Sequence, residues 1–206
     1  MEDVRDWEIW STDKVKVLEE FWKPRRDHDS VRSMLPKDYK SVLDVGCGVG
    51  VFYDLLIENG ASYTGIDSSN AMIERAKERI GPGKFEKGDI YNIRFPEQSF
   101  DLVFCWAVLF HLPDIEIPIK ELCRVSKKYV VFNVWSAKER NALRRGDWNE
   151  YIAEYTDDYL RGLLKKQPFN FEVIPITYIL SDGKIEHFKD HKLFRKVFVL
   201  RRSTQH

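Results

Sequence analysis

Short apolar runs alternate with segments of helical periodicity through the middle of the chain. Five runs between residues 41 and 135 have the length and apolar content of strands, namely SVLDV, SYTGID, KFEKGD, FDLVFCWAV and KYVVFNVW. Helical spacing of apolar residues marks three of the intervals between them, in VFYDLLIENG, SSNAMIERAKERI and PDIEIPIKELCRVS. Strands that alternate with helices predict a parallel sheet with helices on both of its faces.

The pattern changes after Trp135. Residues 136–160 are charged and aromatic, predict no regular element, and are interpreted as an insertion on the substrate side. TDDYLRGLLKKQPF predicts a helix with Thr156 as its N-cap, and FEVIPITYIL and HKLFRKVFVLRR follow as two strands. The short connection between these strands favours an antiparallel pair. We therefore predict a Rossmann-like, doubly wound α/β fold over residues 41–206, whose mostly parallel seven-stranded sheet has an antiparallel last strand.

Charge and composition narrow the classes of partner. Lys and Arg number 33 and so do Asp and Glu, so no overall field favours nucleic acid or an anionic membrane. The chain has no apolar run of about 18 residues that would span a bilayer, and its first ten residues lack the apolar core of a signal peptide. The three cysteines have no CxxC spacing, so we expect free thiols, no metal site and a cytoplasmic protein.

A glycine-rich turn follows the first predicted strand. VLDVGCGVG contains Asp44 and then glycines at 46, 48 and 50, a spacing that lets the backbone turn at positive φ close to a ligand. Asp67 ends the second predicted strand, 21 residues after Gly46. An acid in this place can accept hydrogen bonds from the hydroxyls of a ribose, which suits NAD and an adenosyl cofactor alike.

Two residues favour the adenosyl cofactor. The dinucleotide fingerprint GxGxxG requires glycine at position 51, where this chain has Val51. The carboxylate of Asp44 would repel a pyrophosphate, whereas it would attract an ammonium and a sulfonium. S-adenosyl-L-methionine carries both of these cations and no phosphate, so it is the cofactor that we predict.

Several motifs in order resemble the class I S-adenosylmethionine-dependent methyltransferases, in particular their small single-domain members. VLDVGCGVG is similar to the first motif of that family and GIDSSNAMIERAK to the second. KGDI with FPEQSFDLVFCWAVLFHLPD resembles the third and fourth blocks, and TDDYLRGLLKKQPF the late helix. The resemblance covers about residues 41–200.

The resemblance implies which residues hold the methionine half of the cofactor. The backbone of Gly46, Cys47 and Gly48 is expected to pass beneath it. Asp44 is expected near its amino group, directly or through water. Cys105, at the end of the fourth predicted strand, is expected to offer its carbonyl oxygen to the same amine.

The resemblance also implies a set for the adenosyl half. Asp67 is expected to bind the ribose hydroxyls, and Ser68 to flank the adenine. Asp89 is expected to accept from the exocyclic amine, with the Ile90 amide near the ring. Asp67 as a helix-capping acid and Asp89 as an ordinary turn residue remain the alternatives.

His111 is the candidate catalytic residue, as a general base for an acceptor hydroxyl or amine. The alternative is a histidine that holds its loop to the backbone. Trp106, Phe110 and Trp148 are candidate substrate residues. Trp148 shares a helical spacing with Tyr151, Tyr155 and Tyr159, so a buried helical stripe is the simpler reading of those four.

Residues 1–40 form a separate N-terminal segment that is predicted to be a helical lid over the cofactor or to pack against the sheet edge. The predicted function is methyl transfer by in-line displacement to an oxygen or nitrogen atom of a small-molecule acceptor. A non-catalytic protein that binds S-adenosylmethionine or S-adenosylhomocysteine is one alternative, and an NAD(P)-binding oxidoreductase is the other.

Overall fold

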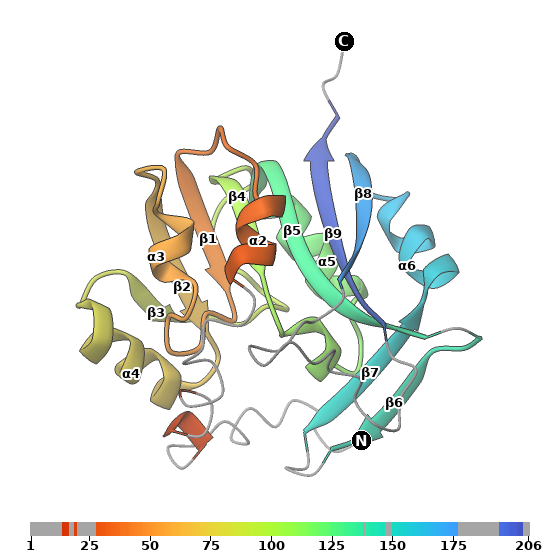
Figure 1. The fold of residues 1–206 in the computed structure, drawn as a ribbon, viewed down its shortest axis with the longest axis horizontal. Coiled ribbons are helices and arrows are strands. Elements are labelled where there is room, and N and C mark those ends of the chain that lie inside the picture. The colour runs from red at the N-terminus through yellow and green to blue at the C-terminus, as the bar shows by residue number, and fades with distance from the viewer. Residues whose placement is uncertain are drawn as a thin grey trace.

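The computed structural model describes residues 14–16, 19, 28–137, 139–146, 150–176 and 194–203. One mixed sheet organises them, with five parallel strands in the order β3-β2-β1-β4-β5 (Figure 1). These strands are β1 (Ser41–Val45), β2 (Ser62–Asp67), β3 (Phe85–Lys87), β4 (Phe100–Cys105) and β5 (Ser126–Ala137). The predicted parallel sheet is therefore confirmed, and the carboxyl ends of β1, β2 and β4 meet at one edge.

The sheet forks at β5, which is longer than its neighbours. β9 (Phe194–Arg202) pairs antiparallel with β5, and β8 (Phe169–Ile176) pairs antiparallel with β9. β7 (Tyr151–Thr156) pairs parallel with the end of β5, and β6 (Ala142–Arg145) pairs antiparallel with β7. Trp135 and Ser136 pair with both β7 and β9, so these two strands lie on opposite edges of β5. β7 therefore occupies the β4 edge of β5, beyond the point where β4 ends.

The sheet has nine strands, two more than predicted, and both additional strands come from residues 136–160. The prediction of a buried helical stripe in this segment is wrong, because Tyr151 and Tyr155 lie on β7 and Tyr159 lies in the following helix. A separation of four residues is even, so it also keeps two side chains on one face of a strand. Trp148 lies outside the described residues.

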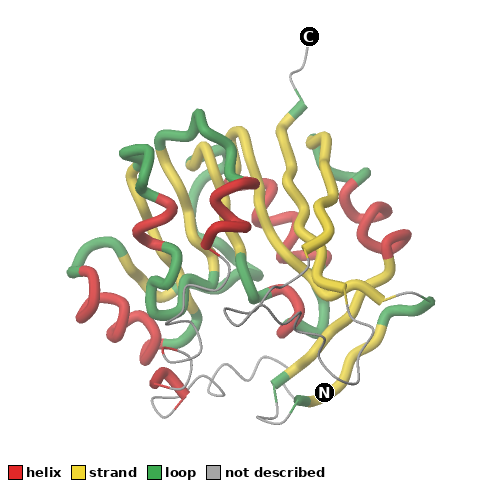
Figure 2. The backbone as a smooth tube through the Cα atoms, viewed as in Figure 1, coloured by secondary structure: helices red, strands yellow, loops and turns green. Residues whose placement is uncertain are grey.

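Helices cover both faces of the sheet (Figure 2). One apolar cluster joins α2 (His28–Met34), α3 (Tyr53–Leu56) and α4 (Asn70–Ile80) to one face. The other cluster joins α5 (Glu116–Val125) and α6 (Asp157–Leu164) to the opposite face. Phe104, Phe132 and Phe198 are fully buried, and burial of each such side chain contributes about 1.5–3 kcal/mol. Among the described residues, no helix combines the length and the apolar character that a membrane span requires.

Helix α6 begins at the cap that the sequence predicts, and α4 begins at one of the three cap candidates that the sequence offers at residues 68–70. Ser69 Oγ accepts a hydrogen bond from the backbone N–H of Met72 (3.3 Å), at the start of α4. Thr156 Oγ1 accepts from the N–H of Tyr159 (3.4 Å), at the start of α6. Each cap supplies an acceptor for one of the unpaired amides of a helix N-terminus. Because Ser69 follows β2 closely, the start of α4 lies next to the carboxyl end of that strand.

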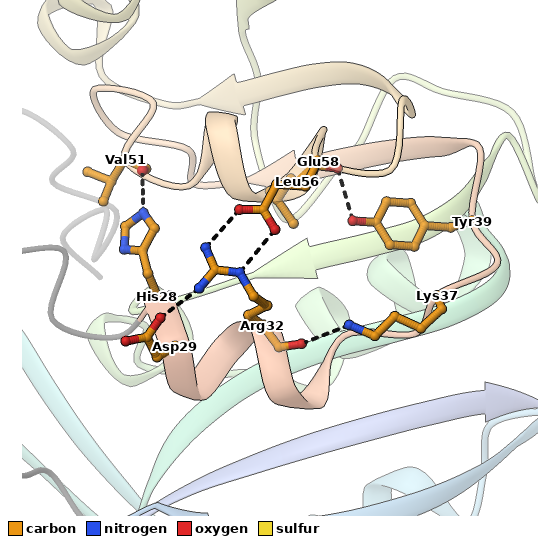
Figure 3. A network of polar contacts seen from close by, with 8 residues as sticks. All are labelled: His28, Asp29, Arg32, Lys37, Tyr39, Val51, Leu56 and Glu58. Atoms are coloured by element: carbon orange, nitrogen blue, oxygen red, sulfur yellow. Dashed lines mark hydrogen bonds and ion pairs between the residues drawn. The ribbon is translucent and has the colours of Figure 1, made fainter.

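Helix α2 fastens the chain that leaves the glycine-rich turn (Figure 3). His28 Nε2 donates to the carbonyl oxygen of Val51 (3.1 Å), and Arg32 binds Glu58 with two hydrogen bonds (2.7 and 3.0 Å). The Arg32–Glu58 pair is exposed and screened by solvent, so fully buried Val31 provides the main attachment of α2. Helix α2 thus holds the chain where it leaves the glycine-rich turn at Val51.

Candidate cofactor and active site

The glycine-rich turn connects β1 to α3. The backbone amides of Gly46 and Cys47 both donate to the carbonyl oxygen of Ile66 on β2 (2.7 and 3.0 Å). Gly46 and Gly48 have φ of 74° and 52°, in the left-handed region that favours glycine. A Cβ on Gly46 would overlap the Val108 side chain, whereas a Cβ on Gly48 would meet no atom within 4 Å. The turn is therefore closely packed at Gly46 and open at Gly48.

Asp67 lies at the carboxyl end of β2, beside the open part of the turn. Its Oδ2 accepts from the amide of Gly48 (2.9 Å), and its Oδ1 accepts from the amide of Ser69 (2.8 Å). Burial raises the pKa of this carboxyl group, although the backbone hydrogen bonds act in the opposite direction. Each carboxylate oxygen can accept a further hydrogen bond, so two fixed oxygens are available to a pair of neighbouring hydroxyls.

Asp44 is 2% exposed on β1, next to the turn. Tyr63 on β2 donates its hydroxyl to Asp44 Oδ2 (2.8 Å). Burial, with a smaller contribution from the charge of Asp67, raises the pKa of Asp44 to about 7, although the Tyr63 hydrogen bond acts in the opposite direction. A ligand cation beside Asp44 would favour the carboxylate form and offset this cost. The group is therefore suited to a positively charged ligand.

The predicted adenine residues follow β2 and β3. Asp89 Oδ1 accepts from the amide of Tyr91 (2.8 Å), so this carboxylate also stabilises its own turn. Ile90 is buried beside it, and Ser68 is partly exposed between β2 and α4. Because β2 and β3 are neighbours in register, Ser68 and Asp89 follow adjacent strand ends.

The chain turns sharply after β4. Cys105 is fully buried, and burial raises the pKa of its thiol well above the ordinary value, so it is not a nucleophile. Ala107 has φ of 60°, an unusual conformation for a residue other than glycine. Trp106 is 4% exposed and stacks on Phe104 (ring centroids 5.7 Å apart), so its ring belongs to the core.

The 3-10 helix η2 (Leu109–His111) follows this turn and carries the candidate base. His111 Nδ1 lies 2.9 Å from the carbonyl oxygen of Tyr151 on β7. A carbonyl oxygen only accepts, so Nδ1 carries the hydrogen, and the neutral ring has its lone pair on Nε2. Phe110 is buried against Trp135 (ring centroids 5.3 Å apart) and leads into His111.

Three residues that the sequence interpretation missed complete the arrangement. Tyr63 binds Asp44, Tyr151 orients His111, and Asn133 on β5 accepts from the amide of Ala107 (2.7 Å). Asn133 had a signal, because it is the one amide in the apolar run KYVVFNVW. The other two contacts depend on strand pairing and register, which the sequence alone does not provide.

The groups at these strand ends fit S-adenosylmethionine. A buried carboxylate suits its ammonium, and the two held oxygens of Asp67 suit its ribose diol. The open face at Gly48 leaves room for a ligand against the backbone. Among the described residues, no group of three or more His, Cys, Asp or Glu side chains could hold a metal ion.

Comparisons with known proteins indicate the class of protein. Residues 43–132 match the family model described as a methyltransferase domain. Sterol 24-C-methyltransferase erg6 of Aspergillus fumigatus is 37% identical over 118 residues, which cover 54% of this chain and 31% of that protein. The 2-methyl-6-phytyl-1,4-hydroquinone methyltransferase of Synechocystis is 34% identical over 146 residues, covering 69% of this chain and 39% of that protein.

A solved structure shares the fold. An N-methyltransferase of Haemonchus contortus, in complex with phosphomonomethylethanolamine and S-adenosylhomocysteine, superposes with a TM-score of 0.76 at 16% identity. The match covers 99% of this chain and 61% of that chain. Residues 43–132 match a methyltransferase domain, which supports the resemblance of the motifs to the class I S-adenosylmethionine-dependent methyltransferases, a family whose cofactor is S-adenosylmethionine. The alignments of this chain span 31% and 39% of the two curated relatives.

Replacement of the buried acid Asp44 by Asn should change how stability depends on pH. The carboxyl has a pKa near 3.8 in a model peptide and about 7 in the folded protein. Between these values the folded state keeps a proton that the unfolded state has lost, so the free energy of unfolding falls as pH rises. From pH 5 to pH 8, the native chain should lose about 3 kcal/mol relative to Asp44→Asn.

Urea unfolding at the two pH values measures this difference. Glu86→Gln, at an exposed position of β3, is the matched control and should follow the native chain at both. Parallel pH curves for the native chain and Asp44→Asn would show that Asp44 is not a buried acid with a raised pKa.

Proposed function

We propose that this chain transfers the methyl group of S-adenosylmethionine to an oxygen or nitrogen atom of a small-molecule acceptor. The observation that supports binding of this cofactor most directly is the geometry of Asp67. Both of its carboxylate oxygens are held by backbone amides at the carboxyl end of β2, and one of these amides belongs to Gly48 of the open turn. A ribose diol bound there would direct the rest of the cofactor along the turn toward Asp44.

Bound S-adenosylmethionine supplies an activated methyl group, so the protein has to align the acceptor and exclude water. Asp44 would hold the ammonium of the methionine half, with the Cys105 carbonyl oxygen nearby. Alignment of this kind can lower a barrier by about 7–11 kcal/mol without an acid–base pair. Buried Phe110 and its partner Trp135 provide apolar surface next to η2.

His111 is proposed to be the general base. Its Nδ1–H is held by the Tyr151 carbonyl oxygen, which orients the ring and leaves Nε2 as the basic atom. A hydroxyl acceptor loses a proton as the methyl group arrives, an ammonium must lose one before its nitrogen can attack, and Nε2 could accept the proton in either case. This role gives β7 a function, and it supports the proposal that residues 136–160 form the substrate side of the site.

A small molecule is the proposed acceptor class. The curated relatives are named for methylation of sterols and of a hydroquinone, which are small molecules. A net charge of zero offers no general attraction for nucleic acid. The three cysteines are free and buried, which supports the expectation of a reducing compartment such as the cytoplasm.

The N-terminal segment is proposed to cover the cofactor. Val15 is 5% exposed and packs with Val49 of the glycine-rich turn and with Met72 of α4. Glu19 forms an ion pair with Arg75 of α4 (2.7 Å). These contacts bring part of residues 1–40 against the glycine-rich turn and against α4, the two elements that follow the proposed cofactor residues Asp44 and Asp67.

Calorimetric titration with S-adenosylmethionine, S-adenosylhomocysteine and NADH tests the cofactor. We expect the first two to bind and NADH not to bind. Release of S-adenosylhomocysteine in the presence of phenols, quinols, amines and sterols then identifies the acceptor class. Binding of NADH alone would contradict the proposal, and cofactor binding without turnover on any acceptor would favour a non-catalytic protein.

Asp67→Ala should weaken S-adenosylhomocysteine binding more than tenfold, because the ribose hydroxyls lose both acceptors. It should also lower stability by about 1–3 kcal/mol, since two backbone amides lose their partner. Ser69→Ala is the matched control, because it lowers stability by about 1 kcal/mol through loss of the α4 cap and keeps the Asp67 carboxylate. Titration and thermal unfolding of both variants separate the effects. Equal affinity in Asp67→Ala and the native chain would exclude the ribose role.

His111→Asn tests the base. The Asn amide can still donate to the Tyr151 carbonyl oxygen, while the basic Nε2 atom is lost. Turnover on the acceptor found above should fall by about 10²–10⁴-fold, with unchanged cofactor affinity and melting temperature. Native turnover in this variant would indicate that His111 only holds its loop to β7.

A further inference from the structure

Asn133 is a polar residue in the centre of an apolar strand. It lies on β5, is fully buried, and is paired in register with Val197 of β9. Val131 and Val197 belong to the apolar cluster on the α2 and α3 face of the sheet. Side chains alternate along a strand, so Asn133 points to the same face as Val131. An apolar side chain would suit this environment better.

The Asn133 side chain makes one hydrogen bond, and its orientation follows from that bond. Its Oδ1 accepts from the backbone N–H of Ala107 (2.7 Å). Because an amide N–H only donates, rotation of the side chain by half a turn would set donor against donor, so Nδ2 is the other group. Nδ2 is buried and has no hydrogen-bond partner among the residues that the structure describes. A buried donor without a partner lowers stability.

The residue that Asn133 holds is itself strained. Ala107 has φ of 60°, and the left-handed region is unfavourable for a residue with a Cβ. Such a conformation persists where surrounding contacts impose it, and it is often found at functional sites. The hydrogen bond from Asn133 stabilises Ala107 in this conformation, at the point where the chain leaves β4.

The strained turn determines where two parts of the site lie. The next residue, Val108, packs so closely on Gly46 that a Cβ there would overlap it. η2 begins at Leu109 and carries His111. The turn after β4 therefore contacts β5 through Ala107 and the glycine-rich turn through Val108, and it leads directly into η2 with the candidate base.

We propose that Asn133 is a positioning residue for methyl transfer. Through Oδ1 it keeps Ala107 in the left-handed conformation, which sets the backbone from Cys105 to Val108 against the methionine half of the cofactor. The inference rests on the proposed function, in which the Cys105 carbonyl oxygen and the Gly46 backbone contact that half. Asn133 itself touches neither the cofactor nor the acceptor.

The test compares two ligands that share the adenosine part. S-adenosylhomocysteine has the amino-acid part, and 5′-methylthioadenosine lacks it. By calorimetry, Asn133→Ala should lower the affinity for S-adenosylhomocysteine at least tenfold and change the affinity for 5′-methylthioadenosine less than twofold. If Asn133 were needed only for stability, its substitution would lower the affinity for both ligands by the same factor.

A second substitution tests the cause. Glycine adopts positive φ without strain, so Ala107→Gly should make the turn less dependent on Asn133. The double variant Asn133→Ala with Ala107→Gly should regain S-adenosylhomocysteine affinity to within about threefold of the native chain. Val131→Ala, on the same face of β5, is the matched control, and it should lower stability without changing the ratio of the two affinities.

If Asn133→Ala does not fold, Ala107→Val provides a second test that does not alter the buried residue Asn133. A β-branched residue is more strained at positive φ, so this variant should also lose S-adenosylhomocysteine affinity selectively. Equal losses for both ligands, no loss, or no recovery in the double variant would overturn the inference. Failure of the native chain to bind S-adenosylhomocysteine would instead overturn the proposed function.

Discussion

Two acids buried at the carboxyl ends of neighbouring strands are the constraint on which the site depends. Asp44 is the last residue but one of β1, Asp67 is the last residue of β2, and burial raises the pKa of both. The protein provides each with hydrogen-bond donors, from Tyr63 to Asp44 and from two backbone amides to Asp67. These donors fix the carboxyl groups in position without neutralising them. The remaining electrostatic cost is lowest when a ligand brings positive charge and hydroxyl groups to the same edge.

The fork at β5 explains how one sheet serves two purposes. Its first five strands form the edge at which the cofactor residues gather. β5 continues past the end of β4 and there pairs with β7, whose Tyr151 carbonyl oxygen orients His111. Tyr155 on the same strand donates its hydroxyl to the carbonyl oxygen of Leu112 (3.0 Å), which fastens the chain after η2. The proposed acceptor side would therefore be an extension of the same sheet, on the regular strands β6 and β7.

The sequence predicted the elements that depend on local patterns. Apolar runs identified the parallel strands, and Thr156 was recognised as a helix cap, with Ser69 as one of three candidates, because capping is a local interaction. The spacing of glycines and acids predicted a nucleoside-bearing ligand, and Val51, the charge of Asp44 and the family resemblance distinguished S-adenosylmethionine from NAD. Residues 136–160 were interpreted incorrectly in part, because their aromatic spacing is compatible with a helix and with one face of a strand.

Contacts between distant segments escaped prediction for a different reason. The bonds from Tyr63 to Asp44 and from Ala107 to Asn133 join residues that are 19 and 26 positions apart. Strand order and register decide whether such residues meet, and neither follows from periodicity alone. Trp106 was a substrate candidate, yet its ring stacks in the core, since β4 ends one residue earlier.

A crystal structure of the chain with S-adenosylhomocysteine is the most direct measurement of the central claim. We expect both ribose hydroxyls within hydrogen-bond distance of the Asp67 carboxylate, and the ligand ammonium on the Asp44 side of the glycine-rich turn. A ribose bound away from β2, or a ligand carboxylate in place of the ammonium beside Asp44, would contradict this account.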